Sequence, residues 1–167
     1  MMRQRGFTLI ELLIVLAIIL IIAAIAIPSL ISVKINANET SAVASIKAIQ
    51  TAQTSYQTSY PAQGYASSLA VLGGSESCTP SPVTACLLDE TLSGGAKAGY
   101  NFAVTAGNPT NGSNTSYVVG AAPASYNRTG LRRFCSTEKS VIRFDANTAG
   151  STAPPTADEC VSFPAMR

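Results

Sequence analysis

Apolar residues dominate the first part of the chain and then give way to a periodic pattern. From Phe7 to Val33 the sequence contains a single charged residue, Glu11. At about 1.5 Å of rise per residue, a helix of this length crosses a bilayer core of about 30 Å. We therefore expect a membrane-spanning helix over residues 7–33.

Beyond Pro28 the apolar residues recur at steps of three, four or their sums, which is typical of one face of a helix. These residues are Ile31, Ile35, Ala42, Ile46, Ile49, Tyr56 and Tyr60. The other faces are filled by Lys34, Asn36, Glu39, Ser41, Ser45, Lys47 and Gln50. The pattern predicts that the helix continues as an amphipathic half over 34–60, until Pro61 and Gly64 end it.

Pro28 lies inside this predicted helix. A proline in a helix interior removes a backbone hydrogen bond and clashes with the preceding turn, at a cost of about 3 kcal/mol. We therefore expect a helix break at Pro28, either a kink or a locally unwound segment from about Ala24 to Pro28.

The second half of the chain has the pattern of β-strands. Alternation with period two predicts strands over 99–104 and 116–121, and shorter strands follow at 131–135 and 140–144. The run Asn108-Pro109-Thr110-Asn111-Gly112 is a strong turn signal between the first two. We expect an antiparallel sheet of about four strands, with the amphipathic half of the helix as the only large element able to cover its apolar face.

These elements predict an α+β fold, in which a long N-terminal helix forms the stem of a lollipop and packs on a small antiparallel sheet. A connecting loop region is expected over 61–98, with short helices at 67–72 and 87–92. The sheet and a C-terminal loop would occupy 99–167, and the tail from Asp145 is expected to be loop.

Composition and charge exclude several classes of function. The 11 Lys and Arg residues nearly balance the 9 Asp and Glu residues, so the chain lacks the basic footprint of a nucleic-acid-binding protein. The adjacent Arg132 and Arg133 are the one feature that could suggest nucleic acid as a partner. We interpret them as a solvated pair on a strand. With no histidine, a Ser-His-Asp or Cys-His arrangement cannot be built. We predict that the chain is not an enzyme and binds no cofactor.

Four cysteines, Cys78, Cys86, Cys135 and Cys160, all follow the membrane-length run. None has Cys-x-x-Cys spacing, so we expect disulfides rather than a metal site. Three pairings are open, and proximity in sequence favours Cys78 with Cys86 and Cys135 with Cys160. Disulfides place this part of the chain in an oxidising compartment.

Glu11 is the unusual residue of the apolar run. An acid within a membrane segment is expensive unless it finds a partner, and it is a functional-site hypothesis by default. Phe7 precedes it by one helical turn. A cut after Gly6 would create an α-amine on Phe7 and so supply a cation near this carboxylate.

The residues Arg5-Gly6-Phe7-Thr8-Leu9-Ile10-Glu11, followed by a long aliphatic run, resemble the prepilin cleavage and methylation motif of type IV pilins, of the type IVa kind of major pilin. The resemblance implies that a prepilin peptidase removes the leader 1–6 between Gly6 and Phe7 and that Phe7 becomes N-methylphenylalanine. It also implies that Glu11 neutralises the terminal amine of a neighbouring subunit during assembly, and Pro28 matches a common position of the family.

This resemblance implies a structural subunit that polymerises with itself into a type IV pilus, or fimbrium, which supports adhesion, twitching motility or DNA uptake. Arg3 and Arg5 precede the apolar run and should stay on the cytoplasmic side. The precursor would therefore be a single-pass protein of the inner membrane with its C-terminal domain outside the cytoplasm. Inner-membrane assembly machinery would then transfer it to an extracellular filament on the cell surface.

Two other interpretations remain open at this point. The first is a type II secretion pseudopilin or a minor pilin; the two predicted disulfides favour the pilus, because major pseudopilins usually lack them. The second is a secretory signal peptide cleaved after Ala26, which would release a soluble secreted domain. Glu11 within the apolar core and the apolar residues beyond Pro28 argue against this second interpretation.

Overall fold

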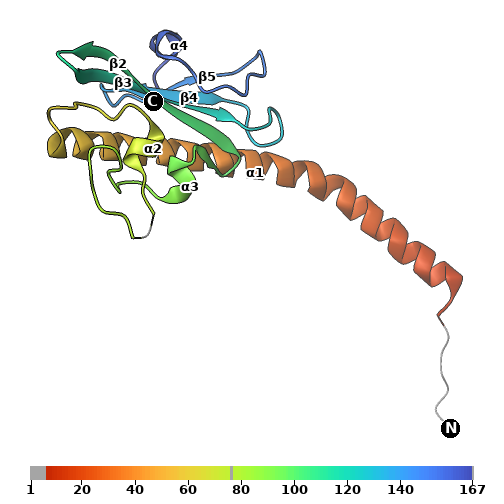
Figure 1. Ribbon diagram of the computed structural model, residues 1–167. Coiled ribbons are helices and arrows are strands. Elements are labelled where there is room, and N and C mark those ends of the chain that lie inside the picture. Colours follow the sequence, from red (N-terminus) through yellow and green to blue (C-terminus); the bar gives the residue numbers. More distant parts are fainter. Residues whose placement is uncertain (1–6, 76, 167) are drawn as a thin grey trace. The chain divides into compact units, whose positions relative to one another are not determined.

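The computed structural model describes residues 7–75 and 77–166 (Figure 1). The chain divides into two compact units, Met1–Lys34 and Ile35–Arg167, which are described separately here. The elements, in chain order, are α1 (Leu9–Ser59), α2 (Leu69–Leu72), α3 (Glu90–Ser93), β1 (Ala96–Lys97), β2 (Tyr100–Thr110), β3 (Ser113–Pro123), β4 (Arg133–Thr137), β5 (Arg143–Asp145) and α4 (Ala157–Ser162).

The described part of the first unit is dominated by the beginning of α1. Its large apolar side chains are exposed along the whole length from Leu9 to Val33. The helix continues through Pro28 without interruption, so the unwound segment expected near Ala24 to Pro28 is not observed in this chain. One proline removes a single backbone donor, and the hydrogen bonds on both sides of it keep the helix intact.

The second unit contains a five-stranded antiparallel sheet in the order β1-β2-β3-β4-β5, so each strand pairs with its neighbour in sequence. β2 and β3 are longer than the sequence predicts, and their register runs from Tyr100 opposite Pro123 to Thr110 opposite Ser113. Asn111 and Gly112 close this hairpin with φ angles of 53° and 83°. Two consecutive positive φ angles are the signature of a type I′ turn, which matches the twist of the strands.

The core of the second unit lies between one face of α1 and one face of the sheet. The helix contributes Ile46, Ile49 and Tyr56, and the sheet contributes Tyr100 and Phe134, among other residues. Ile46, Ile49, Tyr100 and Phe134 are completely buried. The predicted α+β fold of a long helix packed on a small antiparallel sheet is confirmed, with the short β1 as an additional strand.

The packed face of α1 is more polar than the sequence pattern suggests. Glu39, Ser45 and Gln53 are buried, although Glu39 and Ser45 were expected on other faces, while Ile31 is exposed. Gln53 is satisfied because its side chain accepts a bond from the Ala66 N–H (2.8 Å) and donates one to the Ala66 carbonyl (3.1 Å). The helical periodicity of apolar residues could not identify these polar residues as buried, because the hydrogen-bond partners of Glu39 and Gln53 come from other segments of the chain.

Glu39 holds α1 to the segment that leads into β4. Its carboxylate accepts hydrogen bonds from the backbone N–H groups of Leu131 (3.0 Å) and Arg132 (3.1 Å). It also accepts two bonds from the Arg132 guanidinium, at 2.8 and 2.6 Å. A buried carboxylate is tolerated only when it is paired and hydrogen-bonded in this way.

Arg133 is paired on the opposite side of the strand. Its guanidinium donates to Asp145 on β5 at 2.9 Å and to Glu159 on α4 at 3.1 Å. The interpretation as a solvated pair is wrong for Arg133, whose side chain is 12% exposed, while Arg132 is paired with Glu39 and keeps 39% of its side chain exposed. Both cations are bonded to carboxylates of the same chain.

The tail was expected to be loop, but it contains α4. Thr156 and Glu159 form a capping box: the Thr156 N–H donates to the Glu159 carboxylate (2.8 Å), and the Glu159 N–H donates to the Thr156 hydroxyl (3.5 Å). The capping box stabilises this short helix, because the N–H groups of its first turn otherwise lack hydrogen-bond partners.

Two disulfides close the loops of the second unit. They join Cys78 to Cys86 and Cys135 to Cys160, the pairing that proximity in sequence favours. The second bridge ties α4 to β4, and with Val118 it forms a small buried cluster on the face of the sheet opposite α1. Both faces of the sheet are thus covered in part.

We predict that Glu39→Ala lowers the free energy of unfolding by about 3 kcal/mol, because it leaves the two N–H groups and Arg132 without their acceptor. Thermal unfolding of the full chain in detergent measures this loss. The matched control is Glu90→Ala at an exposed position, which should change stability by no more than about 0.5 kcal/mol. Equal effects of the two substitutions would show that Glu39 does not anchor the helix.

A second prediction concerns Glu159. The Thr156 N–H and, more weakly, the Arg133 guanidinium hold the pKa of this carboxyl below its usual range. A lowered folded-state pKa stabilises the fold above the unfolded-state pKa, and this stabilisation is lost as the pH falls through the folded-state value. Glu159→Gln should therefore lower the melting temperature at pH 7 but not at pH 2. A difference that persists unchanged at pH 2 would contradict this assignment.

Candidate functional site at the start of α1

Glu11 lies in the first turn of α1 and bonds to Thr8, the residue that caps the helix. The Thr8 N–H and hydroxyl both donate to the Glu11 carboxylate, at 2.9 and 2.6 Å. The Glu11 N–H donates in return to the Thr8 hydroxyl at 3.3 Å. This reciprocal arrangement is a capping box, and it satisfies backbone donors at the helix N-terminus.

Sequence analysis singled out Glu11 but missed Thr8. The signal was present, because Thr8-Leu9-Ile10-Glu11 has the spacing of a capping box ahead of an apolar run. The carboxylate is thus partnered within its own chain before any cut is made. Both Thr8 groups bond to Oε2 of this carboxylate, so Oε1 keeps its lone pairs for a further partner.

Phe7 precedes this cap and is 79% exposed. It is the first described residue, so Gly6 and the leader 1–6 lie outside the described residues. The structure therefore brings Thr8 and Glu11 together at the helix start, while the geometry of the predicted cut is not described.

The apolar half of α1 has the properties of a membrane span. An 18-residue window of this helix has a mean hydropathy of 3.3, and none of it is buried by the rest of the described chain. A soluble core helix of similar composition would be covered by its own protein. Length and composition are sufficient for a bilayer crossing.

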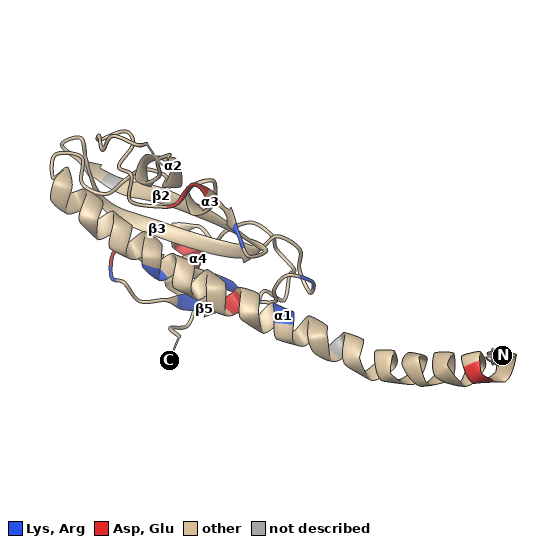
Figure 2. Cartoon of the chain, turned by 90° about the horizontal axis from the view of Figure 1, so that it is seen from below, with Lys and Arg blue, Asp and Glu red and all other residues tan. Residues whose placement is uncertain are grey.

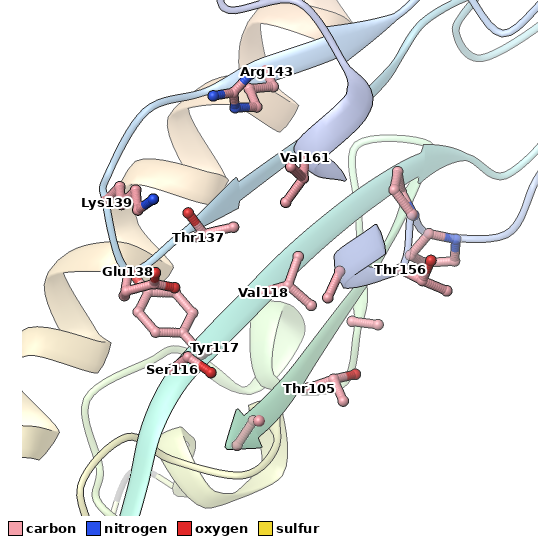
Figure 3. A pocket seen from close by; sticks show the side chains of 16 residues that line it. Thr105, Ser116, Tyr117, Val118, Thr137, Glu138, Lys139, Arg143, Thr156 and Val161 are labelled. Atoms are coloured by element: carbon pink, nitrogen blue, oxygen red, sulfur yellow. The ribbon is translucent and has the colours of Figure 1, made fainter. Parts of the chain in front are cut away.

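A separate cavity of about 390 Å³ lies in the second unit, over the face of the sheet that carries Thr105 and Val118 (Figure 3). The charged side chains around it are Glu138, Lys139 and Arg143. Its hydroxyl groups have no histidine beside them, because the chain has none.

Tyr117 also lines this cavity and lies against Tyr65, with ring centroids 4.8 Å apart. Burial, aided by the nearby Tyr65 and Glu138, raises the pKa of Tyr117 to about 12. Its hydroxyl therefore stays protonated at neutral pH. Within residues 7–75 and 77–166, no cluster of three His, Cys, Asp or Glu side chains could hold a metal ion.

The comparison with protein families gives a match at the N-terminus. Residues 1–27 match the family described as the prokaryotic N-terminal methylation motif. The matched segment includes Gly6, Phe7 and Glu11, the residues that sequence analysis assigned to processing and assembly. This N-terminal segment of the chain is therefore similar to a prepilin-type N-terminus.

A second comparison, with individual proteins, gives a more specific similarity. The chain is 54% identical over 54 residues to the type IV major pilin protein PilA of Myxococcus xanthus (strain DK1622). This region covers 32% of the chain and 24% of the relative, so the match spans about a quarter of the relative's length. No solved structure matches the chain. Together the two sequence matches support the resemblance to type IV pilins.

Proposed function

We propose that this chain is the precursor of a structural subunit that polymerises into a type IV pilus. The observation that carries the proposal is the motif from Arg5 to Glu11, followed by an apolar helix half that its own chain leaves uncovered. Pilins are structural proteins, so the function of the chain lies in packing against copies of itself. The second unit would then form the surface of the filament.

Maturation begins with hydrolysis of the peptide bond between Gly6 and Phe7 by a prepilin peptidase. Water supplies the carboxylate oxygen to Gly6 and a proton to the nitrogen of Phe7, which becomes an α-amine. A methyl donor then converts this residue to N-methylphenylalanine. The exposed position of Phe7, ahead of the helix cap, agrees with access by an enzyme.

Assembly would exploit the new charge. Glu11 is bonded to Thr8 in the single chain, and we propose that in the filament its carboxylate also pairs with the amine of Phe7 on a neighbouring subunit. The carboxylate has further lone pairs for this second partner. An unpaired charge among apolar helices is penalised, so the pair fixes the axial register between neighbours.

Packing of the apolar halves supplies the remaining specificity. In lipid, the side chains from Leu9 to Val33 contact acyl chains, and in the filament they would contact equivalent helices. The exchange replaces lipid by closely packed protein without exposing apolar surface to water. Pro28 is proposed as the position where the helix breaks when packing in the filament requires it.

A long pilus is favoured over a secretion pseudopilus by the two disulfides and by the match to a major pilin. An oxidising environment for both bridges also agrees with a second unit outside the cytoplasm. We propose that the precursor crosses the inner membrane once and that mature subunits leave it for the filament.

The first experiment is mass spectrometry of the N-terminal peptide from material sheared off the cell surface. The proposal expects a chain that begins with N-methylated Phe7. A chain that begins at Ile27 would instead identify a secreted domain released from a signal peptide, and the proposal would be wrong. Electron microscopy of the same material then distinguishes long pili from short secretion structures.

A further prediction separates the two roles of Glu11. Glu11→Ala should leave cleavage at Phe7 intact but reduce the yield of filaments by about tenfold or more, because a terminal amine is left unpaired. The control is Thr8→Ala, which removes the capping hydroxyl and keeps the carboxylate. If Thr8→Ala impairs assembly as strongly as Glu11→Ala, the effect comes from the helix cap and the proposed pairing is refuted.

A further inference from the structure

A loop of the second unit presents an exposed apolar tip. Val83 lies between Pro82 and Thr84, and its side chain is 75% exposed. Single exposed apolar residues are ordinary on protein surfaces. This one is unusual because the surrounding structure holds it in a fixed position.

Three features brace the tip, which consists of Pro82 and Val83. The flanking residues Ser81 and Thr84 exchange two backbone hydrogen bonds, at 2.9 and 3.2 Å. The disulfide between Cys78 and Cys86 closes the loop outside them. The hydroxyl of Tyr56 on α1 donates to the Pro82 carbonyl at 2.6 Å. A contact element that is already rigid loses little entropy when it binds.

The same unit carries a groove of about 440 Å³ beside α1, with a lining that is partly apolar and partly polar. Val43, Lys47 and Gln50 line it from the helix, while Ser140, Val141 and Ile142 line it from the segment between β4 and β5. Met166 completes the lining, and both Val141 and Met166 are exposed. We call these seven residues the α1–β5 groove.

The tip and the groove belong to different sides of the second unit. The disulfide loop is bonded to α2 through the Ala85 N–H and the Val71 carbonyl (2.7 Å), and α2 packs on α3, which in turn contacts β1. The α1–β5 groove lies by the other end of the strand order. Figure 2 shows α2 and α3 on one side of α1 and β5 on the other. Two different patches that fit each other join copies head to tail, as a helical filament requires.

Charge supports the same pairing of surfaces. Asp89 and Glu90 follow the disulfide loop, and the ion pair of Asp89 with Lys97 (3.2 Å) is exposed and therefore weak. Among the described residues Glu90 has no ion-pair partner, and neither does Lys47 in the groove. The side that carries the disulfide loop is therefore acidic, while the α1–β5 groove carries the cation of Lys47.

We propose that the Val83 tip of one subunit docks into the α1–β5 groove of a second copy of this chain. The apolar tip would contact Val43 and Val141, and Lys47 would face the acidic side of the neighbour. This inference rests on the proposed function, because it places the contact between subunits of the filament. It adds a contact between the second units to the packing of the apolar helices.

The test measures the yield of sheared filaments and the temperature at which they dissociate. Val83→Lys puts a cation against the apolar side chains of Val43 and Val141 and should reduce filament yield by about tenfold, which corresponds to about 1.4 kcal/mol. Lys47→Glu should also reduce the yield, because it sets an anion against the acidic side of the neighbour, and adding Glu90→Lys to Lys47→Glu should restore it. The matched control is Val161→Lys on α4, at a valine that is 68% exposed and lies outside both surfaces.

The outcomes separate this inference from the proposed function. Thermal unfolding of each detergent-solubilised chain first establishes that the substitutions leave the fold unchanged. Normal filaments from Val83→Lys, or an equal loss from Val161→Lys, would overturn the docking while pilus formation stands. A loss from Lys47→Glu that Glu90→Lys does not repair would also overturn it, because Lys47 would then not face the acidic side of the neighbour. If the natural chain forms no filaments, the proposed function fails and this contact fails with it.

Discussion

The apolar segment from Leu9 to Val33 needs a cover that its own chain does not supply. Its side chains are exposed throughout, and no part of the most apolar window is buried by the rest of the described residues. In water such a surface would be unfavourable by roughly 25 cal/mol for each Å² of apolar area. Lipid and copies of the same helix both relieve this cost, and neither requires the helix to change its structure. Under the proposed function, a single surface would therefore serve both in the membrane and in the filament.

The part of α1 from Ile35 to Ser59 is covered within its own chain. The sheet packs on it, and two of its buried polar side chains have hydrogen-bond partners in other segments. Glu39 meets Arg132 and two backbone donors, and Gln53 meets both backbone groups of Ala66. Such matched polar contacts fix the register of the helix on the sheet, which apolar packing alone would leave adjustable. The second unit thus holds its own core together independently of what covers Leu9 to Val33.

Much of this fold follows from local patterns in the sequence. The long apolar run, the periodic helix face, the alternating strands and the Asn111-Gly112 turn each depend on neighbours in the chain. The features that the sequence did not predict share a different cause. The buried position of Glu39 and the pairing of Arg132 and Arg133 depend on residues far away in sequence, so no local pattern could predict them. The short helix α4 is an exception, since the spacing of Thr156 and Glu159 was a readable signal.

The residues of the candidate site were also only partly predictable from the sequence. The roles of Gly6, Phe7 and Glu11 are predictions from a motif and from the cost of a charge in an apolar run. Thr8 was missed although its spacing to Glu11 predicts the cap. Its importance becomes clear only with the geometry, because the cap shows that Glu11 is already partnered in the single chain.

The order of the strands has a consequence for how the chain folds as it is made. Each strand pairs with the next one in sequence, so the sheet can grow by successive hairpins with only short loops to close. The helix is synthesised before all of them, yet its anchor points Leu131 and Arg132 are 92 and 93 residues beyond Glu39. The part of α1 around Glu39 therefore stays without its partners until residues 131 and 132 have been made, while the part around Gln53 finds Ala66 much earlier. During that interval the uncovered end of the packed face is exposed to aggregation.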